Sequence, residues 1–524
     1  MTDASPVLTR AQSVEWEKRL LGDDPERAWR AMNRAGSALG SALLEDYREI
    51  GPPPKQPRLL ILAGKGHNAG DAFLAAVELL RARPGTQVGV CLAAGERGLN
   101  PLALRAWGCL LKAAGENLRW RSPRADREAG EWTAPFGSEN WDIVVDGLLG
   151  MNFRPPLRPP HDGLLQWIND HDGIRLRAAV DLPSGLTDEG NGPAFRADFT
   201  YLTGIAKQPA FQPAAAEWTG RIRFLDIGFF DSETPAETEG AVLTGGVLDR
   251  LRGLRPAMAD KRHAGKLVLV GGSRRMPGAL LMSTLAACRA GAGLVTAVAP
   301  ESVVPAFAAA VPEAMWIGCP ETPSGGLALD SLGPVTEALE AAGAAVIGPG
   351  LGRDPETMAF LEELLRTADR PLVLDADALQ PELLRHLRTE RMRDRKILTP
   401  HQGEYTRLAG SPFAGSGLEG LRRLAREEGA VVLLKGPPYS RISDGERVRY
   451  GIDGGPVLAR GGSGDLLAGI IGACLASAPE DPWRAALRGQ VWHGRAADRL
   501  ARHAGQTAVR STELLDHLGP VLRE

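Results

Sequence analysis

The sequence predicts an α/β protein of two domains, each built around a parallel sheet. Three observations support this fold class. Short apolar runs rich in Val, Leu and Ile alternate with longer Ala- and Leu-rich stretches, as expected for strands buried on both faces and separated by helices. The chain has 524 residues, enough for more than one domain. Residues 231–240 are polar, acidic and free of apolar periodicity, as a linker should be.

The expected strands fall into two groups on either side of this linker. We therefore predict domains over 1–230 and 241–524, joined by 231–240. The expected strands are 59–63, 88–92, 143–146 and 178–181 in the first domain, and 267–270, 294–298, 345–348, 372–375 and 431–434 in the second. The two halves share this alternation but show no sequence repeat.

Composition limits the class of protein. Apolar residues make up 44% of the chain, charged residues 24%, and the formal net charge is −3, so we expect neither nucleic acid nor an anionic membrane as a partner. No apolar run is long enough to span a bilayer, and the first residues lack a signal-peptide pattern. The five cysteines are scattered without metal-ligand spacing, which favours a cytoplasmic protein. We also expect a homo-oligomer, of a size that the sequence does not indicate.

In the first half, three polar loops follow expected strands. Gly64-Lys-Gly-His-Asn-Ala-Gly-Asp71 precedes an expected helix over 72–80, in the order strand, glycine turn, helix that is typical of phosphate-binding folds. Asp146 and Asp181 end two further strands. Ligands of open α/β sheets bind at the carboxyl ends of strands, so the three loops should converge on one crevice. Taken singly, either aspartate could equally be a loop cap.

In the second half, the most informative stretch is Gly461-Gly-Ser-Gly-Asp465, followed by an apolar helical run over 466–478. Glycines before a helix expose N–H groups, and a helix N-terminus carries partial positive charge, so the stretch predicts an anion cradle. A carboxylate there could take a proton from a hydroxyl as it attacks a phosphoryl group. The alternative for Asp465 is a simple N-cap of a buried helix.

Other turns of the second half also follow expected strands. They are Gly348-Pro-Gly-Leu-Gly352, Leu374-Asp-Ala-Asp-Ala378, Leu398-Thr-Pro-His-Gln-Gly-Glu404 and Leu433-Leu-Lys-Gly436. Each has a structural alternative: the first could be only a tight turn, and His401 only a capping residue. Their order along one domain favours a single functional site.

The order of motifs in the first half resembles the N-terminal domain of bifunctional NAD(P)H-hydrate repair enzymes, which epimerises the hydrated nicotinamide. The resemblance covers roughly residues 12–230 and implies a Rossmann-like three-layer sandwich. The matching segments are Met32-Asn-Arg-Ala-Gly36, the loop at 64–71, Asp146-Gly-Leu-Leu-Gly150, Asp181-Leu-Pro-Ser-Gly185, Lys207-Gln-Pro209 and Asp226-Ile-Gly228.

This resemblance implies roles for individual residues. Asp181 matches the acid–base residue. Asn68, Asp146 and Ser184 match potassium ligands. The implied contacts with the epimerase substrate are His67, Asn68, Ala69, Gly70, Asp71, Gly147, Gly150 and Asp181. Ala69 and Ala72 stand where the family has glycine, and alanine would be strained if this loop needs positive φ.

The second half resembles the C-terminal, ribokinase-like domain of the same enzymes over roughly 240–520. Besides the turns above, His263–Ser273 and Gly278–Val295 match. The resemblance implies that Asp465 is the catalytic base and that magnesium accompanies ADP. The implied substrate contacts are Ala279, Gly350, Gly352, His401 and Asp465. The implied nucleotide contacts are Lys435, Gly436, Pro437, Pro438, Tyr439, Gly462, Ser463 and Gly464. Segments 437–440 and 453–460 differ from the family pattern, so the sequence leaves ADP or ATP open as donor.

We therefore expect an enzyme that repairs hydrated NADH and NADPH. One half would interconvert the R and S hydrates, and the other would dehydrate the S form with ADP, releasing AMP and phosphate. Two alternatives stay open at this point. The chain could be a ribokinase-type small-molecule kinase, or its epimerase-like half could be degenerate and only bind or stabilise.

Overall fold

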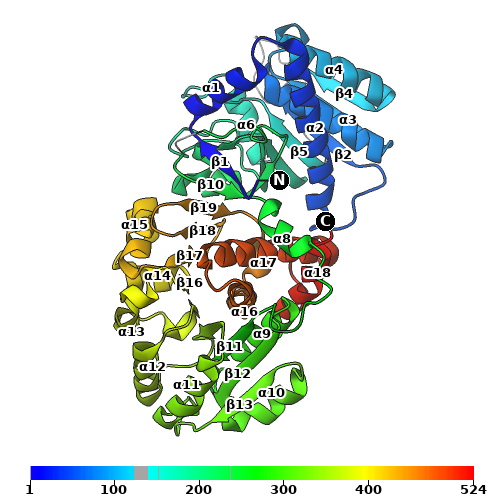
Figure 1. Cartoon of the computed structure of the whole chain (residues 1–524). Helices are drawn as coiled ribbons and strands as arrows, with labels where there is room; N and C mark the ends of the chain where they lie inside the picture. Colours follow the sequence, from blue (N-terminus) through cyan, green and yellow to red (C-terminus); the bar gives the residue numbers. More distant parts are fainter. Residues whose placement is uncertain (1, 123–139, 152, 236–237) are drawn as a thin grey trace. The chain divides into compact units, whose positions relative to one another are not determined.

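The computed structural model describes residues 2–122, 140–151, 153–235 and 238–524, which form two compact units (Figure 1). The N-terminal unit comprises Ser5–Val242 and Ala501–Gly505. The C-terminal unit comprises Met1–Ala4, Leu243–Leu500 and Gln506–Glu524. The main division thus lies next to the expected linker 231–240, of which residues 236 and 237 lie outside the described part of the chain.

The N-terminal unit is built on a seven-stranded parallel sheet, counted over its described residues, in the order β4-β3-β2-β5-β6-β7-β9. Its strands are β2 (Arg58–Ala63), β3 (Gln87–Leu92), β4 (Leu118–Arg121), β5 (Trp141–Gly147), β6 (Ile174–Val180), β7 (Phe199–Thr203) and β9 (Arg221–Leu225). Its helices include α1 (Arg10–Leu21), α2 (Pro25–Tyr47), α3 (His67–Ala82), α4 (Pro101–Ala114), α6 (His161–Asn169) and α7 (Ala216–Thr219). Short strands β1 (Ala4–Leu8), β8 (Ala206–Lys207) and β10 (Ala241–Leu243) lie outside this sheet.

Strand β2 shows why continuous apolar runs predicted these strands. Leu59 and Ile61 pack with helices α2, α3 and α4 on one face of the sheet. Leu60 and Leu62 pack with α6 on the other. Because alternate side chains point to opposite faces, a strand covered by helices on both sides needs apolar residues at every position.

Helix α3 starts earlier than predicted. The sequence suggested a loop to Asp71 and a helix from Ala72, whereas α3 begins at His67 with Gly66 as its N-cap. Ala69 and Ala72 therefore lie within a helix, fully or almost fully buried, and neither is among the described non-glycine residues with positive φ. The expectation of strain at these alanines was wrong, because alanine is the residue that a helix accommodates best.

The C-terminal unit contains the strand order β13-β12-β11-β14-β15-β16-β17-β18-β19. Strands β11 to β17 are parallel, as predicted, but β18 and β19 form an antiparallel pair at one side. The strands are β11 (Lys266–Val270), β12 (Leu294–Pro300), β13 (Met315–Cys319), β14 (Ala344–Ile347), β15 (Leu372–Leu374), β16 (Lys396–Leu398), β17 (Val431–Leu434), β18 (Ser440–Ser443) and β19 (Val448–Gly451).

Helices cover both faces of this sheet. Those in this part of the chain are α8 (Asp249–Arg252), α9 (Pro277–Arg289), α10 (Val304–Ala310), α11 (Leu332–Glu340), α12 (Pro355–Thr367), α13 (Pro381–Leu384), α14 (Gln402–Ala409), α15 (Phe413–Glu428), α16 (Ser463–Ser477), α17 (Pro482–Ala504) and α18 (Leu518–Val521). Helices α11 to α15 share one hydrophobic core with the sheet. Helix α16 packs on α9, β11, β14 and β15. A Cβ at Gly469 of α16 would lie 2.1 Å from the carbonyl oxygen of Ser283, so glycine permits this close helix packing.

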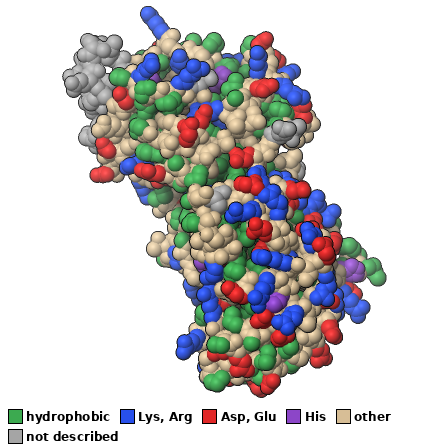
Figure 2. All heavy atoms as spheres, turned by 90° about the vertical axis from the view of Figure 1, so that its left-hand side faces the viewer, with side chains coloured by type: hydrophobic (Ala, Val, Ile, Leu, Met, Phe, Trp, Pro, Cys, Tyr) green, Lys and Arg blue, Asp and Glu red, His purple; other side chains and the backbone are tan. Residues whose placement is uncertain are grey.

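The surface shows no single dominant charge on the face in view. Figure 2 shows acidic and basic side chains interspersed over it. Within the described residues, no helix is both long and apolar enough to cross a membrane.

Candidate active sites

Successive strands of the C-terminal unit place polar groups at their carboxyl ends. Gly348 follows β14, Asp375 follows β15, Thr399 and His401 follow β16 shortly, and Lys435 follows β17. Because these strands are parallel neighbours, their ends meet at one edge of the sheet. The strand order reverses direction around β11 and β14, which is where open α/β sheets bind ligands.

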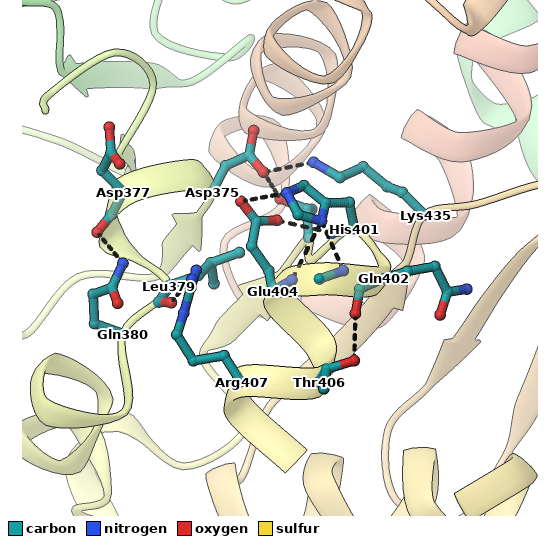
Figure 3. A network of polar contacts seen from close by, with 12 residues as sticks. Asp375, Asp377, Leu379, Gln380, His401, Gln402, Glu404, Thr406, Arg407 and Lys435 are labelled. Atoms are coloured by element: carbon teal, nitrogen blue, oxygen red, sulfur yellow. Dashed lines mark hydrogen bonds and ion pairs between the residues drawn. The ribbon is translucent and has the colours of Figure 1, made fainter. Parts of the chain in front are cut away.

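A lysine–aspartate pair lies at the centre of this edge (Figure 3). The Nζ of Lys435 lies 2.7 Å from Oδ1 of Asp375, and Thr399 donates its hydroxyl to the same oxygen at 2.8 Å. A Cβ at Gly464 would lie 3.2 Å from that Nζ, so the predicted anion cradle adjoins the pair. The motif Leu374–Ala378 was predicted from the sequence without a role for Asp375, whose position at a strand end was the signal for one.

Helix α16 begins at Ser463, and Gly462 is its N-cap with φ of 90°. No side chain caps this helix. The carboxylate of Asp465 makes no hydrogen bond with a described residue, so the alternative of a simple N-cap was wrong. Burial, followed by the nearby negative charge of Asp375, raises the pKa of Asp465 to about 6, while Lys435 acts in the opposite direction. The result is a partly buried carboxylate that is free to accept a proton beside an anion cradle.

His401 caps helix α14, as its structural alternative proposed. Its Nδ1 accepts hydrogen bonds from the backbone N–H groups of Gly403 and Glu404, and the backbone N–H of His401 donates to Glu404 in return. The ring remains 61% exposed, so the cap holds it in place while leaving a face open to a ligand. Burial raises the pKa of Glu404, a residue that the sequence reasoning had not assigned.

The remaining predicted contacts of this unit divide into two groups. Gly350 and Ala279 are neighbours, since a Cβ at Gly350 would lie 3.0 Å from Ala279 Cβ, and Gly352 donates its N–H to Asp377 at 2.9 Å. Tyr439, in contrast, is 4% exposed, and its ring packs edge-on against a second tyrosine in the core. Its side chain is therefore not presented to a nucleotide.

His493 of α17 is a further buried group that the sequence did not reveal. It is 3% exposed, and its Nε2 has no hydrogen-bond partner among the described residues. Burial and the charge of Lys435 lower the pKa of His493 to about 4, and its ring interacts with the backbone of Ser463. The histidine is therefore neutral beneath the cradle. The amphipathic spacing of α17 carries no pattern that would have predicted this.

The three polar loops of the N-terminal unit converge as expected. Gly64 donates its N–H to the carbonyl of Gly147 at 3.1 Å. The Asn68 amide donates to the carbonyls of Leu149 and Val180, each at 3.0 Å. The loops after β2, β5 and β6 are thus joined by hydrogen bonds at the carboxyl edge of the sheet.

The oxygens of Asn68, Asp146 and Ser184 fit a monovalent cation. Asp146 is 1% exposed and accepts hydrogen bonds from the Ser184 hydroxyl and backbone, both at 2.7 Å, and from Leu148 N–H at 3.2 Å. Burial raises the pKa of Asp146 to about 6, since no described basic side chain pairs with it. The Asn68 oxygen accepts no hydrogen bond from described residues. A buried carboxylate with a spare lone pair and a free amide oxygen suits a hard cation.

The second centre of this unit is a buried ion pair. The Nζ of Lys207 lies 2.5 Å from Oδ1 of Asp181, and the two side chains are 1% and 6% exposed. Asp181 has a φ of 69°, a conformation that costs a non-glycine residue about 1 kcal/mol or more. Such local strain is typical of functional positions.

Two further carboxyl groups, those of Asp71 and Glu17, interact electrostatically with this ion pair. Burial and the charges of Asp181 and Glu17 raise the pKa of Asp71 well above its usual value. Burial raises the pKa of Glu17 to about 7, against the charge of Lys207. Glu17 lies on α1, and no local pattern would have predicted that it reaches this centre. The unit therefore holds one lysine among three carboxyl groups, those of Asp181, Asp71 and Glu17.

The structure places some of the other predicted contacts of this unit at the site and others away from it. His67 is the first residue of α3, and burial lowers its pKa. A Cβ at Gly150 would lie 3.2 Å from the Asn68 oxygen, so Gly150 lies at the site. Gly70 instead faces α2, where a Cβ would lie 2.6 Å from the Met32 sulfur, and Ala69 is fully buried. The structure therefore places neither Gly70 nor the side chain of Ala69 at the site.

These two constellations define the class of protein. A parallel α/β unit with an anion cradle, a free carboxylate and a lysine at its strand ends is an enzyme fold suited to phosphoryl transfer, and it is joined to a second α/β unit with its own acid–base centre. Comparison with known proteins supports an enzyme with these two α/β units. Residues 267–519 match the family model described as NAD(P)H-hydrate dehydratase, and residues 30–209 match that of the YjeF-related protein N-terminus.

Relatives cover nearly the whole chain. The chain is 36% identical to the bifunctional NAD(P)H-hydrate repair enzyme Nnr of Moorella thermoacetica, over 89% of this chain and 87% of that protein. It is 32% identical to the Escherichia coli enzyme of the same name, over 93% and 88%. A solved ADP/ATP-dependent NAD(P)H-hydrate dehydratase from Bacillus subtilis is 30% identical, with a TM-score of 0.44 over 53% of this chain and 96% of that one. The chain belongs to the family of bifunctional NAD(P)H-hydrate repair enzymes.

Proposed function

We propose that the C-terminal unit dehydrates the S hydrate of NADH and NADPH with ADP, and that the N-terminal unit interconverts the R and S hydrates. The observation that carries the first activity is the Asp465 carboxylate, which makes no hydrogen bond with any described residue and lies in the first turn of a helix without a side-chain cap. The observation that carries the second is the buried pair of Asp181 and Lys207. Family membership supports both.

The dehydratase chemistry follows from the groups at the strand ends. The ring hydroxyl of the hydrate is a poor leaving group, so its conversion to a phosphate ester is needed before elimination. Asp465 takes the proton of this hydroxyl as its oxygen attacks the β-phosphoryl group of ADP and AMP leaves. The free N–H groups at the start of α16, together with Lys435, stabilise the negative charge on the phosphoryl oxygens. Elimination of phosphate, with loss of a ring proton, then restores the double bond.

The substrate and the nucleotide would occupy adjacent parts of the edge. Ala279, Gly350, Gly352 and His401 would contact the hydrate, since glycines there leave room for a ring. Gly436 and the prolines that follow it would contact the nucleotide mainly through the backbone. We propose ADP as donor in preference to ATP, with the product pair AMP and phosphate.

Epimerisation inverts the carbon that carries the hydroxyl and the ring nitrogen. The hydroxyl can be protonated and leave as water, and water can then add to the other face and lose a proton, so the site needs one group that gives a proton and one that accepts it. Asp181, held by Lys207, is suited to accept a proton. Asp71 is suited to donate one, because burial and neighbouring negative charges raise its pKa well above its usual value and so favour its protonated form. The two carboxyl groups would act on the hydroxyl-bearing carbon while His67 and Gly150 border the ring.

Two metal ions fit this function. Potassium would be held by Asn68, Asp146 and Ser184, where it would balance the buried Asp146 carboxylate and fix the loops that surround the substrate. Magnesium would enter with ADP and neutralise its phosphates. Among the described residues no three His, Cys, Asp or Glu side chains cluster as metal ligands, so phosphate oxygens and water would supply most of its coordination.

The test uses two single variants on separated hydrates. With S hydrate and ADP, the wild-type protein should regenerate NADPH and release AMP and phosphate, and Asp465→Asn should not. With R hydrate and no ADP, Asp465→Asn should still form S hydrate, and Asp181→Asn should not. Accumulation of a stable phosphorylated product by the wild type would instead identify a conventional small-molecule kinase.

A further inference from the structure

A polar hollow lies in the C-terminal unit, among the first turns of α17, the short helix α8 with the turn before it, and the N-terminal segment. Its volume is about 230 Å³. It is lined by Asp3, Gly246, Val247, Asp249, Arg250, Arg484, Leu487 and Arg488. None of these residues belongs to the two candidate active sites, so the hollow needs a separate explanation.

Arg488 is the most informative group in its wall. It is 6% exposed, and it makes no hydrogen bond or ion pair with any described residue. Its Nε is buried without a partner. A guanidinium carries five donors and keeps its charge in proteins, so burying it without a counter-charge is costly. The hollow lies next to this guanidinium, and an anion bound there would supply the missing counter-charge.

Two more arginines border the same space. Arg484 precedes Arg488 by four residues on α17 and therefore lies on the same face of that helix. It forms an ion pair with the preceding Asp481, with Nε 3.6 Å from Oδ2. Arg250, at the start of α8, is exposed and has no ion pair or hydrogen bond with described residues. Three guanidinium groups thus come from two separate elements.

The two carboxylates in the wall do not cancel this charge. Asp249 forms an ion pair of 2.8 Å with Arg252, which is not part of the lining. Asp3 interacts electrostatically with Arg449, which also lies outside it. The lining carries three guanidinium groups against two carboxylates, so the hollow keeps an excess of positive charge.

We propose that this hollow binds a phosphate-type oxyanion, either free inorganic phosphate or a phosphoryl group of a nucleotide. Guanidinium groups match the geometry of carboxylates and phosphates. Three of them around one space suit a divalent anion better than a single carboxylate. The site would be a second anion site, distinct from the cradle at Gly462–Asp465, and it does not depend on the proposed function.

The test is thermal unfolding of the full chain in a phosphate-free buffer, with inorganic phosphate or AMP added and potassium chloride at matched ionic strength as the control. Phosphate should raise the unfolding temperature of the wild type. Arg250→Ala, at an exposed position, should weaken the apparent affinity about tenfold, as expected for loss of one charge-assisted contact. Arg423→Ala, at an exposed arginine of α15, is the matched control and should respond like the wild type.

Arg488→Met provides a second readout. Without phosphate it should be at least as stable as the wild type, because an unpaired buried charge is removed. Its response to phosphate should fall to the part that the cradle at Gly462–Asp465 contributes. A response to phosphate that Arg250→Ala weakens identifies the free ion as the ligand of this hollow, and a response to AMP alone that Arg250→Ala weakens identifies a nucleotide phosphoryl group. No response to either ligand, or an equal response in the wild type and Arg250→Ala, would overturn the proposal. If Arg488→Met does not fold, Arg250→Ala still decides the question.

Discussion

At the scale of single residues, the protonation of Asp465 should set the pH dependence of the dehydratase. The proposed base works only when it is ionised, and its pKa is raised to about 6, so kcat/KM should fall as the pH drops through about 6. Asp375→Asn removes a negative charge beside Asp465, which should lower the pKa of Asp465 and move the acidic limb of the pH profile to lower pH. Lys435→Met removes a positive neighbour and should move it to higher pH. The measurement is a pH profile of kcat/KM for the S hydrate in all three proteins.

The opposite directions of these two shifts make the test specific. Loss of nucleotide contacts alone would lower the rate of Lys435→Met without moving the limb. A limb that stays at the same pH in both variants would show that Asp465 is not the titrating group.

The pair of Asp181 and Lys207 should be important for both stability and epimerisation. Lys207→Met leaves a buried carboxylate without its cation, which should cost about 3–5 kcal/mol of unfolding free energy and abolish epimerisation. The double variant Asp181→Asn, Lys207→Met carries no unpaired charge and should recover most of the stability but none of the activity. Denaturant unfolding of both proteins checks this. Equal loss of stability in the two would argue against a strong ion pair.

At the scale of elements, helix α3 gives the clearest correction to the sequence prediction. Ala69 and Ala72 lie in its first two turns and are buried, so family-like glycines are not needed there. Ala69→Gly and Ala72→Gly should each lower the stability of the N-terminal unit by about 1 kcal/mol without raising epimerase activity. Thermal unfolding and the rate of R to S conversion measure the two effects. A variant with more activity and unchanged stability would restore the idea of a strained loop.

Each predicted strand overlaps a strand of the structure, although β7 and β16, which are also buried throughout, were not predicted. Leu59–Ala63 and Val431–Leu434 are continuous apolar runs, and each lies within a parallel strand. Strands β18 and β19 were missed, because Arg441 and Arg449 interrupt their apolar pattern. Their antiparallel pairing forms a turn at Asp444-Gly445 that reads as an ordinary loop in the sequence.

The candidate sites could be predicted only in part, because only some of their residues lie in motifs that can be recognised locally. Glycine-rich turns and aspartates at strand ends can be recognised locally, which is why Asp146, Asp181 and Asp465 could be singled out. Glu17 and His493 reach the sites from helices that are distant in sequence. The helices that carry Glu17 and His493 show only ordinary amphipathic spacing. These two residues come close to a lysine only in the folded chain.

At the scale of the whole molecule, each candidate site is formed by residues of its own compact unit. The Asp181 centre uses the N-terminal unit, and the Asp465 cradle uses the C-terminal unit. The two activities should therefore be separable by point variants and should complement each other in solution. Linking them in one chain is useful because hydration damage yields both epimers, whereas the proposed dehydratase consumes one.

The most direct test is the recovery of NADPH from a mixture of R and S hydrates with ADP. The wild type, and a mixture of the variants Asp181→Asn and Asp465→Asn, should each recover nearly all of the NADPH. Asp181→Asn alone should stop at the S fraction, apart from slow spontaneous epimerisation, and Asp465→Asn alone should recover none. Wild-type recovery that stops at the S fraction would contradict a bifunctional repair enzyme and leave the N-terminal unit without a catalytic role.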